Sequence, residues 1–182
     1  MTLLVIGVVL WIAAHFFKRV MPDARARMGD KGKGVIALIL FASIALMVIG
    51  YRSAEYVHVY TTPSWGIHLN NLIMVFAVIL MGLGNSKSRF NGVTRHPMLA
   101  GVRAWAIAHL LVNGDLASLI LFGGMFVWAF VQVILINRAE PDWTKPEPGN
   151  LAGDIKLLVI SVVVFGVFAG VHMLLGYPVF PG

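Results

Sequence analysis

Two things are scarce in this chain: cysteine and charge. None of its 182 residues is a cysteine, which excludes disulfides, thiolate metal sites and a cysteine nucleophile. Charged residues make up 12% of the chain and hydrophobic residues 59%, whereas a soluble domain carries about 25% charge. So few polar side chains cannot cover a globular surface. The composition therefore predicts an all-α polytopic membrane protein with a single domain over residues 1–182.

Long apolar segments recur along the chain. A helix needs about 17–25 mainly apolar residues to cross the hydrocarbon of a bilayer. The segments that meet this length are approximately 2–20, 34–51, 66–84, 97–113, 116–136 and 154–176. The first is not a signal peptide, because its basic residues follow the apolar stretch. The sequence thus predicts a bundle of about six transmembrane helices.

Lysine and arginine are concentrated in alternate loops. The stretches 18–33, 85–96 and 137–153, with their flanks, hold all of them except Arg52. Cytoplasmic loops of membrane proteins carry this excess, so both termini are expected outside. The same orientation explains the net charge of +6 without any nucleic-acid partner. We expect a lipid bilayer around the chain and a bacterial inner membrane as its location.

Three of the six histidines stand four residues after a large aromatic residue inside a predicted span. They are His15 after Trp11, His109 after Trp105 and His172 after Phe168. Residues i and i+4 share a helix face, so each helix would present an aromatic ring beside an imidazole. A single such histidine is explained by a hydrogen bond to a neighbouring helix, but packing does not require the same pairing three times.

The chemistry of these histidines favours a haem over other metal sites. Neutral imidazole is a standard axial ligand of haem and also binds Zn, Cu and Fe. Mg and Ca prefer oxygen ligands, and the predicted spans contain almost no Asp or Glu.

A basic cluster precedes the fourth predicted span. Pro97 suits the first position of a helix, where its missing N–H has no intrahelical partner anyway, so His96 is expected at the helix cap beside Arg95. Arg103 lies six residues into the helix and can extend back toward the interface. Arg95, His96 and Arg103 could bind an anionic group such as a propionate, a lipid phosphate or a nucleotide. The alternative is that the basic residues only orient the chain in the membrane and that Pro97 only starts the helix.

The chain resembles the NnrU family of bacterial integral membrane proteins, which is named for an association with nitrite and nitric oxide metabolism. The resemblance is carried by His15, the stretches 94–101 (TRHPMLAG) and 105–115 (WAIAHLLVNGD), Arg138 and the closing 172–178 (HMLLGYP). It extends to the plant zeta-carotene isomerase, which is similar in its membrane core and is a haem b protein with histidine ligands.

The resemblance implies haem b as the cofactor of this chain and a redox, isomerase-like or denitrification-related role. It also implies His15 and His109 as the axial ligands, with an apolar small molecule or denitrification proteins as partners. The remaining candidate cofactor-binding residues are His96, His172, Arg95, Arg103, Trp11, Trp105 and Asn113.

The spacing of the residues does not decide which two histidines would be the axial ligands. His109 lies about 20 Å from the start of its helix at 1.5 Å per residue, whereas His15 lies near the opposite end of a helix that runs the other way. The two differ in depth by about 10–15 Å, which helix tilt could close in part. Otherwise His109 would pair with His172, and His15 with His96.

Two other functions remain in competition with a haem protein. Arg95-His96-Pro97 before a small-residue helix is similar to a motif of membrane methyltransferases that use S-adenosylmethionine, and Arg138-Ala139-Glu140 is a partial echo of their acidic motif. A paired acidic motif and a downstream tyrosine region are missing from the chain. A non-enzymatic scaffold or assembly factor also agrees with the short loops.

Overall fold

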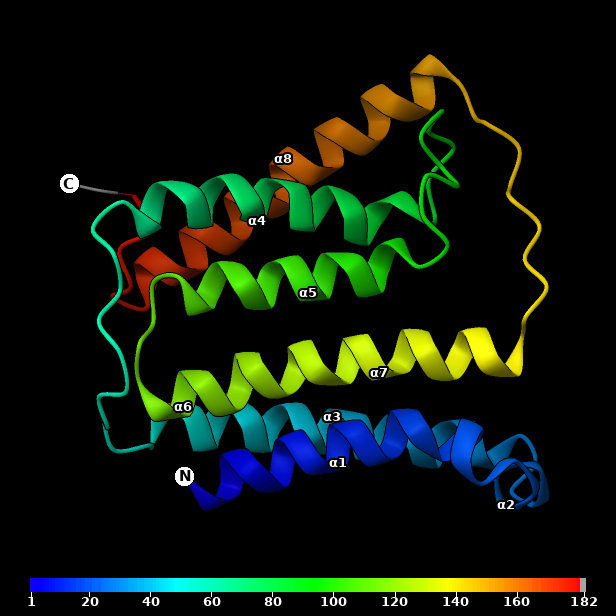
Figure 1. Ribbon diagram of the computed structural model, residues 1–182, viewed down its shortest axis with the longest axis horizontal. Coiled ribbons are helices and arrows are strands. Elements are labelled where there is room, and N and C mark those ends of the chain that lie inside the picture. The colour runs from blue at the N-terminus through cyan, green and yellow to red at the C-terminus, as the bar shows by residue number, and fades with distance from the viewer. Residues whose placement is uncertain (181–182) are drawn as a thin grey trace. The chain divides into compact units, whose positions relative to one another are not determined.

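The computed structural model describes residues 1–180, and among these residues it contains helices and loops but no strand (Figure 1). The helices are α1 (Thr2–Val20), α2 (Pro22–Arg27), α3 (Lys31–Arg52), α4 (Gly66–Leu83), α5 (Pro97–Leu110), α6 (Leu116–Ser118), the π-helical turn η1 (Leu119–Gly123), α7 (Gly124–Ala139) and α8 (Leu151–Leu174). The last part of this order contains one long helix, because α6, η1 and α7 run on from Leu116 to Ala139.

Within residues 1–180, five helices are long and apolar enough to cross a membrane: α1, α3, α4, the continuous Leu116–Ala139 helix and α8. The prediction of a helical membrane bundle is confirmed. Three of these helices, α3, α7 and α8, extend about three residues beyond one end of the predicted spans. In α3 and α7 the added residues include Lys31 and Arg138, so polar residues continue these two helices beyond the apolar run, whereas α8 begins earlier at Leu151, after its N-cap Asn150.

The fourth predicted span, 97–113, is shorter in the structure. Helix α5 has 14 residues, about 21 Å of helix, against a hydrocarbon thickness of about 30 Å. The helix ends at Leu110. A few residues later, the carbonyl of Gly114 accepts hydrogen bonds from the amides of Val59 and Tyr60 at 2.9 and 3.0 Å.

The chain divides into two compact units. The first comprises Met1–Thr61 and Asn113–Pro141, and the second comprises Thr62–Val112 and the stretch that begins at Asp142. In the first unit α1 packs along α3 and beside η1 and α7. Helices α1 and α7 run in the same direction and α3 runs against them (Figure 1). Arg19 and Glu140 form an ion pair at 2.8 Å where α1 and α7 end.

Close approach of α1 and α3 depends on glycine. A Cβ atom at Gly50 would overlap the backbone of Leu4, and Leu4 is fully buried. A Cβ at Gly124, the first residue of α7, would lie 2.8 Å from Val8 Cγ1. Gly50 thus lets α3 lie against α1 at Leu4, and Gly124 lets α7 lie against α1 at Val8.

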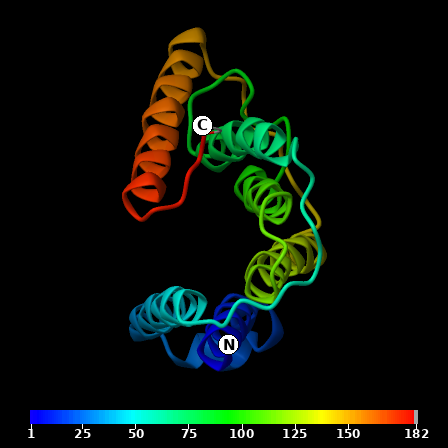
Figure 2. The same ribbon diagram turned by 90° about the vertical axis from the view of Figure 1, so that its left-hand side faces the viewer.

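The second unit is built around α4, which packs along α5 and α8 (Figure 2). Helices α5 and α8 run in one direction and α4 in the other (Figure 1). Gly101 permits the contact with α4, because a Cβ there would lie 2.7 Å from the carbonyl oxygen of Ala77. The ends of α5 and α8 are therefore at the same end of this unit.

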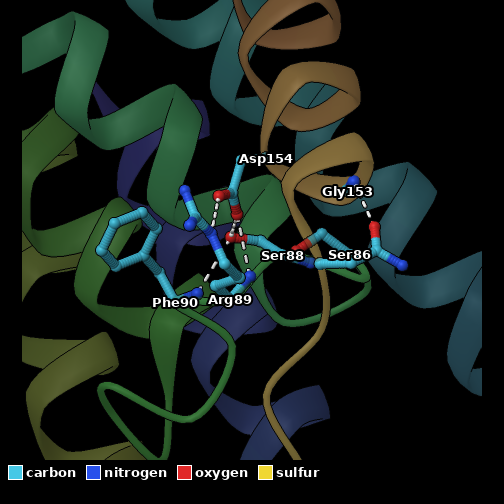
Figure 3. A network of polar contacts seen from close by, with 7 residues as sticks. Ser86, Ser88, Arg89, Phe90, Gly153 and Asp154 are labelled. Atoms are coloured by element: carbon cyan, nitrogen blue, oxygen red, sulfur yellow. Dashed lines mark hydrogen bonds and ion pairs between the residues drawn. The ribbon is translucent and has the colours of Figure 1, made fainter.

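A polar network holds the beginning of α8 to the loop that follows α4 (Figure 3). Asp154 accepts hydrogen bonds from Ser88 Oγ at 2.7 Å, from the Arg89 amide at 2.8 Å and from Arg89 Nε at 2.6 Å. The side chain of Asn150 caps α8 by accepting from the Gly153 amide at 2.9 Å. The network fixes where α8 starts.

Candidate functional site

The three histidines of the aromatic-histidine pairs make the same hydrogen bond. Nδ1 of each donates to the carbonyl of the aromatic residue four positions earlier: His15 to Trp11 at 2.9 Å, His109 to Trp105 at 2.9 Å and His172 to Phe168 at 2.8 Å. A carbonyl oxygen can only accept, so Nδ1 carries the proton and Nε2 of the neutral ring carries the lone pair. Metal-binding histidines are commonly oriented in this way, with one ring nitrogen bonded to a carbonyl and the other available to the metal.

In the first unit, His15 lies in an aromatic cluster with Trp11 and Trp128. The centroid of its ring is 4.3 Å from that of Trp11 and 4.6 Å from that of Trp128. The two indole rings meet edge to face at 5.3 Å. Trp128 is 5% exposed. Trp128 was not predicted from the sequence as part of this cluster, because no histidine follows it at the i+4 position.

Buried polar atoms lie in and beside this cluster. Within residues 1–180, Trp11 Nε1, Trp128 Nε1 and Gln132 Oε1 are buried and have no hydrogen-bond partner. Trp128 and Gln132 are four residues apart on α7 and share a helix face. The parallel course of α1 and α7 places Gln132 one turn further toward the end where Arg19 and Glu140 pair.

In the second unit, His109 and His172 lie beside each other. Their ring centroids are 6.3 Å apart, and the ring of His109 is 5.2 Å from that of Trp105. His109 stands in the last turn of α5 and His172 in the last turn of α8. His109 with His172 is the pairing that the sequence offered as the alternative to His109 with His15.

His15 and His109 belong to different compact units. The pair that the resemblance implies as axial ligands is therefore still a prediction. Among the described residues there is no group of three or more His, Asp or Glu side chains placed to hold a metal ion.

The basic cluster lies at the other end of α5 from His109. His96 is the N-cap residue of α5 and Pro97 takes the first position, so the predicted helix start is confirmed. His96 is 13 residues from His109, about 20 Å along a helix. Arg103 donates through Nε to the carbonyl of Leu99, at 3.4 Å. Arg95 and His96 therefore lie at the start of α5 and His109 in its last turn, and the binding of an anionic group by the basic cluster stays a prediction.

Asn113 belongs to the first unit and its carbonyl oxygen has a structural role. It accepts a hydrogen bond from the hydroxyl of Tyr60 at 2.8 Å. Burial raises the pKa of Tyr60, and the charge of Asp115 adds to this shift. Asp115 also caps α6 by accepting from the Ser118 amide at 2.9 Å. Through these contacts the turn at 113–115 holds the loop between α3 and α4.

The long apolar helices define the class: this is a polytopic helical membrane protein. His15 and His172 lie in two of these helices, and His109 lies in the shorter helix α5. The chain belongs to the NnrU family, described as NnrU protein, whose sequence model matches residues 3–179. The match spans both compact units. No curated protein and no solved structure matches the chain significantly.

Proposed function

We propose that this protein binds haem b in the membrane, with intramembrane histidines as axial ligands of the iron. The observation that carries the proposal is the hydrogen bond from Nδ1 to the i−4 carbonyl, made by His15, His109 and His172. It leaves the lone pair on Nε2, which is the form of imidazole that ligates iron. Three repetitions on three helices are not required by packing.

The residues around these histidines fit a haem. The ligand atoms are neutral nitrogens, and aromatic rings lie 4.3 Å from His15 and 5.2 Å from His109. Among the described residues, the rings that lie beside His15 and His109 are Trp11, Trp128, Trp105 and His172, and none of these side chains is a carboxylate that would favour a hard metal ion such as Mg²⁺. The resemblance implies His15 and His109 as ligands, and His109 is also the histidine that lies beside His172.

The protein's own contribution would be to hold and orient the cofactor in an apolar environment. The carbonyls of Trp11 and Trp105 fix the rotation of the His15 and His109 rings. Haem iron, when bound, supplies one-electron redox chemistry or binding of a small ligand. We place this activity in a bacterial inner membrane, in a redox, isomerase-like or denitrification-related role with an apolar substrate or a denitrification protein as partner.

The visible spectrum of the detergent-purified protein, oxidised and reduced, tests this function. We expect a stoichiometric Soret band after expression with sufficient haem, and a changed band in His109→Ala. The matched control is His68→Ala, which removes an exposed histidine from the first turn of α4 and should leave the band unchanged. A wild-type protein without haem would contradict the proposal. Titration with S-adenosylmethionine would then separate the methyltransferase from the scaffold.

A further inference from the structure

We propose that the first compact unit binds one anionic phospholipid. An acyl chain of this lipid lies in an apolar groove between α1 and α3, and its phosphate lies beside the basic residues of the 18–33 stretch. The groove has a volume of about 240 Å³ and is lined by four residues of α1 from Leu10 to Phe17, three of α3 from Val35 to Ile39, and Met28. All of them belong to the first compact unit, so the site depends neither on the second unit nor on a haem.

The groove begins where the close contact between α1 and α3 ends. Nearer the start of α1, a Cβ at Gly7 would lie 2.8 Å from Cγ of Met47. Beyond Gly7, the lining residues of α1 follow the spacing i, i+3, i+4 and i+7, so they share one face of the helix. The middle two are Ala13 and Ala14. Because the side chain of alanine is a single methyl group, this face leaves the space toward α3 open.

The lining of the groove suits a hydrocarbon chain. Every lining residue is apolar, and a water molecule needs several polar partners to stay in such a space. If the groove were empty, its lining would lose dispersion contacts. Ala13 and Val35 are exposed, so the groove opens at the surface of the unit. The helix from Leu10 to Phe17 is about 10 Å long, which gives room for a stretch of an acyl chain parallel to α1.

A guanidinium group lies next to the apolar lining. A Cβ at Gly32 would lie 2.7 Å from Cβ of Met28 and 2.8 Å from Nη1 of Arg25. Arg25 is therefore beside Met28 at the start of α3, where α2 joins the ends of α1 and α3 (Figure 1). Nη1 of Arg25 donates to the carbonyl of Gly29 at 3.1 Å, and a guanidinium has further N–H donors. Their planar arrangement matches the oxygens of a phosphate.

The 18–33 stretch keeps a surplus of positive charge beyond its ion pairs. Arg19 pairs with Glu140 at 2.8 Å. Lys33 pairs with Asp30 at 2.9 Å. The other charged side chains of the stretch are Lys18, Arg25, Arg27, Lys31 and Asp23. Basic clusters beside membrane helices attract anionic headgroups. A zwitterionic phospholipid offers the same acyl chains without net charge, so the surplus predicts selectivity for an anionic lipid.

Native mass spectrometry of the detergent-purified protein tests this site. The protein is offered phosphatidylglycerol and phosphatidylcholine with identical acyl chains. We expect the wild type to retain one phosphatidylglycerol in preference to phosphatidylcholine. We expect Ala14→Phe, which fills the groove, to lose this lipid. Ala37→Phe is the matched control, because Ala37 is exposed on α3 outside the groove lining, and it should retain the lipid.

Arg25→Gln tests the phosphate contact and covers the case in which Ala14→Phe does not fold. We expect it to lower the retention of phosphatidylglycerol about fivefold, the effect of one basic residue near an anionic lipid surface. Its control is Arg52→Gln, which removes a basic residue from the other end of α3 and should leave the retention unchanged. Equal retention of the two lipids by the wild type would overturn the proposal. So would unchanged retention of phosphatidylglycerol in Arg25→Gln or in a folded Ala14→Phe.

Discussion

Histidine four residues after an aromatic residue gives the same local geometry at three places in this protein. The i−4 carbonyl is within reach of Nδ1 in each case, at 2.8 to 2.9 Å. What differs is the surroundings of each ring. His15 contacts Trp128 from another helix, whereas His109 lies beside a second histidine. His15 therefore belongs to an aromatic cluster, whereas His109 belongs to a pair of histidines.

Gln132 offers a test of the unsatisfied polar atoms near His15. Its carbonyl oxygen is buried without a partner, and such an atom costs about 1–3 kcal/mol. We expect Gln132→Leu, which removes it at similar volume, to raise the free energy of unfolding by about 1 kcal/mol. In a chain of this size that is about 2–4 °C in Tm, measured by thermal unfolding in detergent.

Ser118→Ala is the matched control for Gln132→Leu. The Ser118 hydroxyl bonds to Asp115 at 2.5 Å and to Tyr51 at 2.8 Å, so its removal leaves partners unsatisfied. We expect a loss of about 1–2 kcal/mol. A decrease in stability for Gln132→Leu similar to that of Ser118→Ala would show that the Gln132 side chain is satisfied.

At the scale of elements, helix contacts depend on where small residues stand. Gly50 lets α3 lie against the backbone of α1 at Leu4, and Gly101 lets α5 lie against α4 at Ala77. Without a hydrophobic force between helices in lipid, such close approach is a main source of association. Helix α5 is held in this way although it has only 14 residues.

Two glycines of α3 should respond to alanine in opposite ways. A Cβ at Gly50 would overlap the Leu4 backbone, whereas a Cβ at Gly34 would meet nothing within 4 Å. We expect Gly50→Ala to destabilise the protein by about 1–3 kcal/mol or more, as overpacking does. We expect Gly34→Ala to stabilise it by about 0.5–1 kcal/mol, since alanine is the better helix former. Equal midpoints of thermal unfolding in detergent for the two variants would contradict the α1–α3 contact.

At the scale of the whole molecule, the distribution of charge predicts the orientation in the membrane. The loops rich in Lys and Arg are expected in the cytoplasm. This places the 53–65 loop outside and the 140–150 loop inside. Since the chain has no cysteine, a single cysteine introduced into one loop reports the side of the membrane on which that loop lies, without labelling of any native thiol.

We expect a membrane-impermeant maleimide to label Ser64→Cys in intact cells and Asp142→Cys only after lysis. Both residues are exposed in the structure, so access depends on the side of the membrane. Comparison with a permeant maleimide controls for reactivity. The reverse pattern of labelling would invert the topology.

Several features could be predicted from the sequence because each depends on residues close in the chain. Apolar runs longer than a bilayer is thick determine the long helices. Pro97 after His96 determines where α5 begins. The spacing of aromatic and histidine residues determines their shared helix face, because side chains four residues apart are neighbours on any α-helix. The family was also recognisable from the motifs.

Other features depend on contacts between distant segments. The hydrogen bonds from the amides of Val59 and Tyr60 to the carbonyl of Gly114 join segments more than 50 residues apart, and no local sequence pattern predicts them. Trp128 meets His15, and His172 meets His109, only because separate helices pack together. Spacing along one helix fixes a side chain's face but not its neighbour, since neighbours across helices depend on which small residues let two backbones approach. The sequence by itself therefore determined the long helices, their membrane character and the candidate histidines, whereas only the tertiary structure decided which side chains lie beside each histidine.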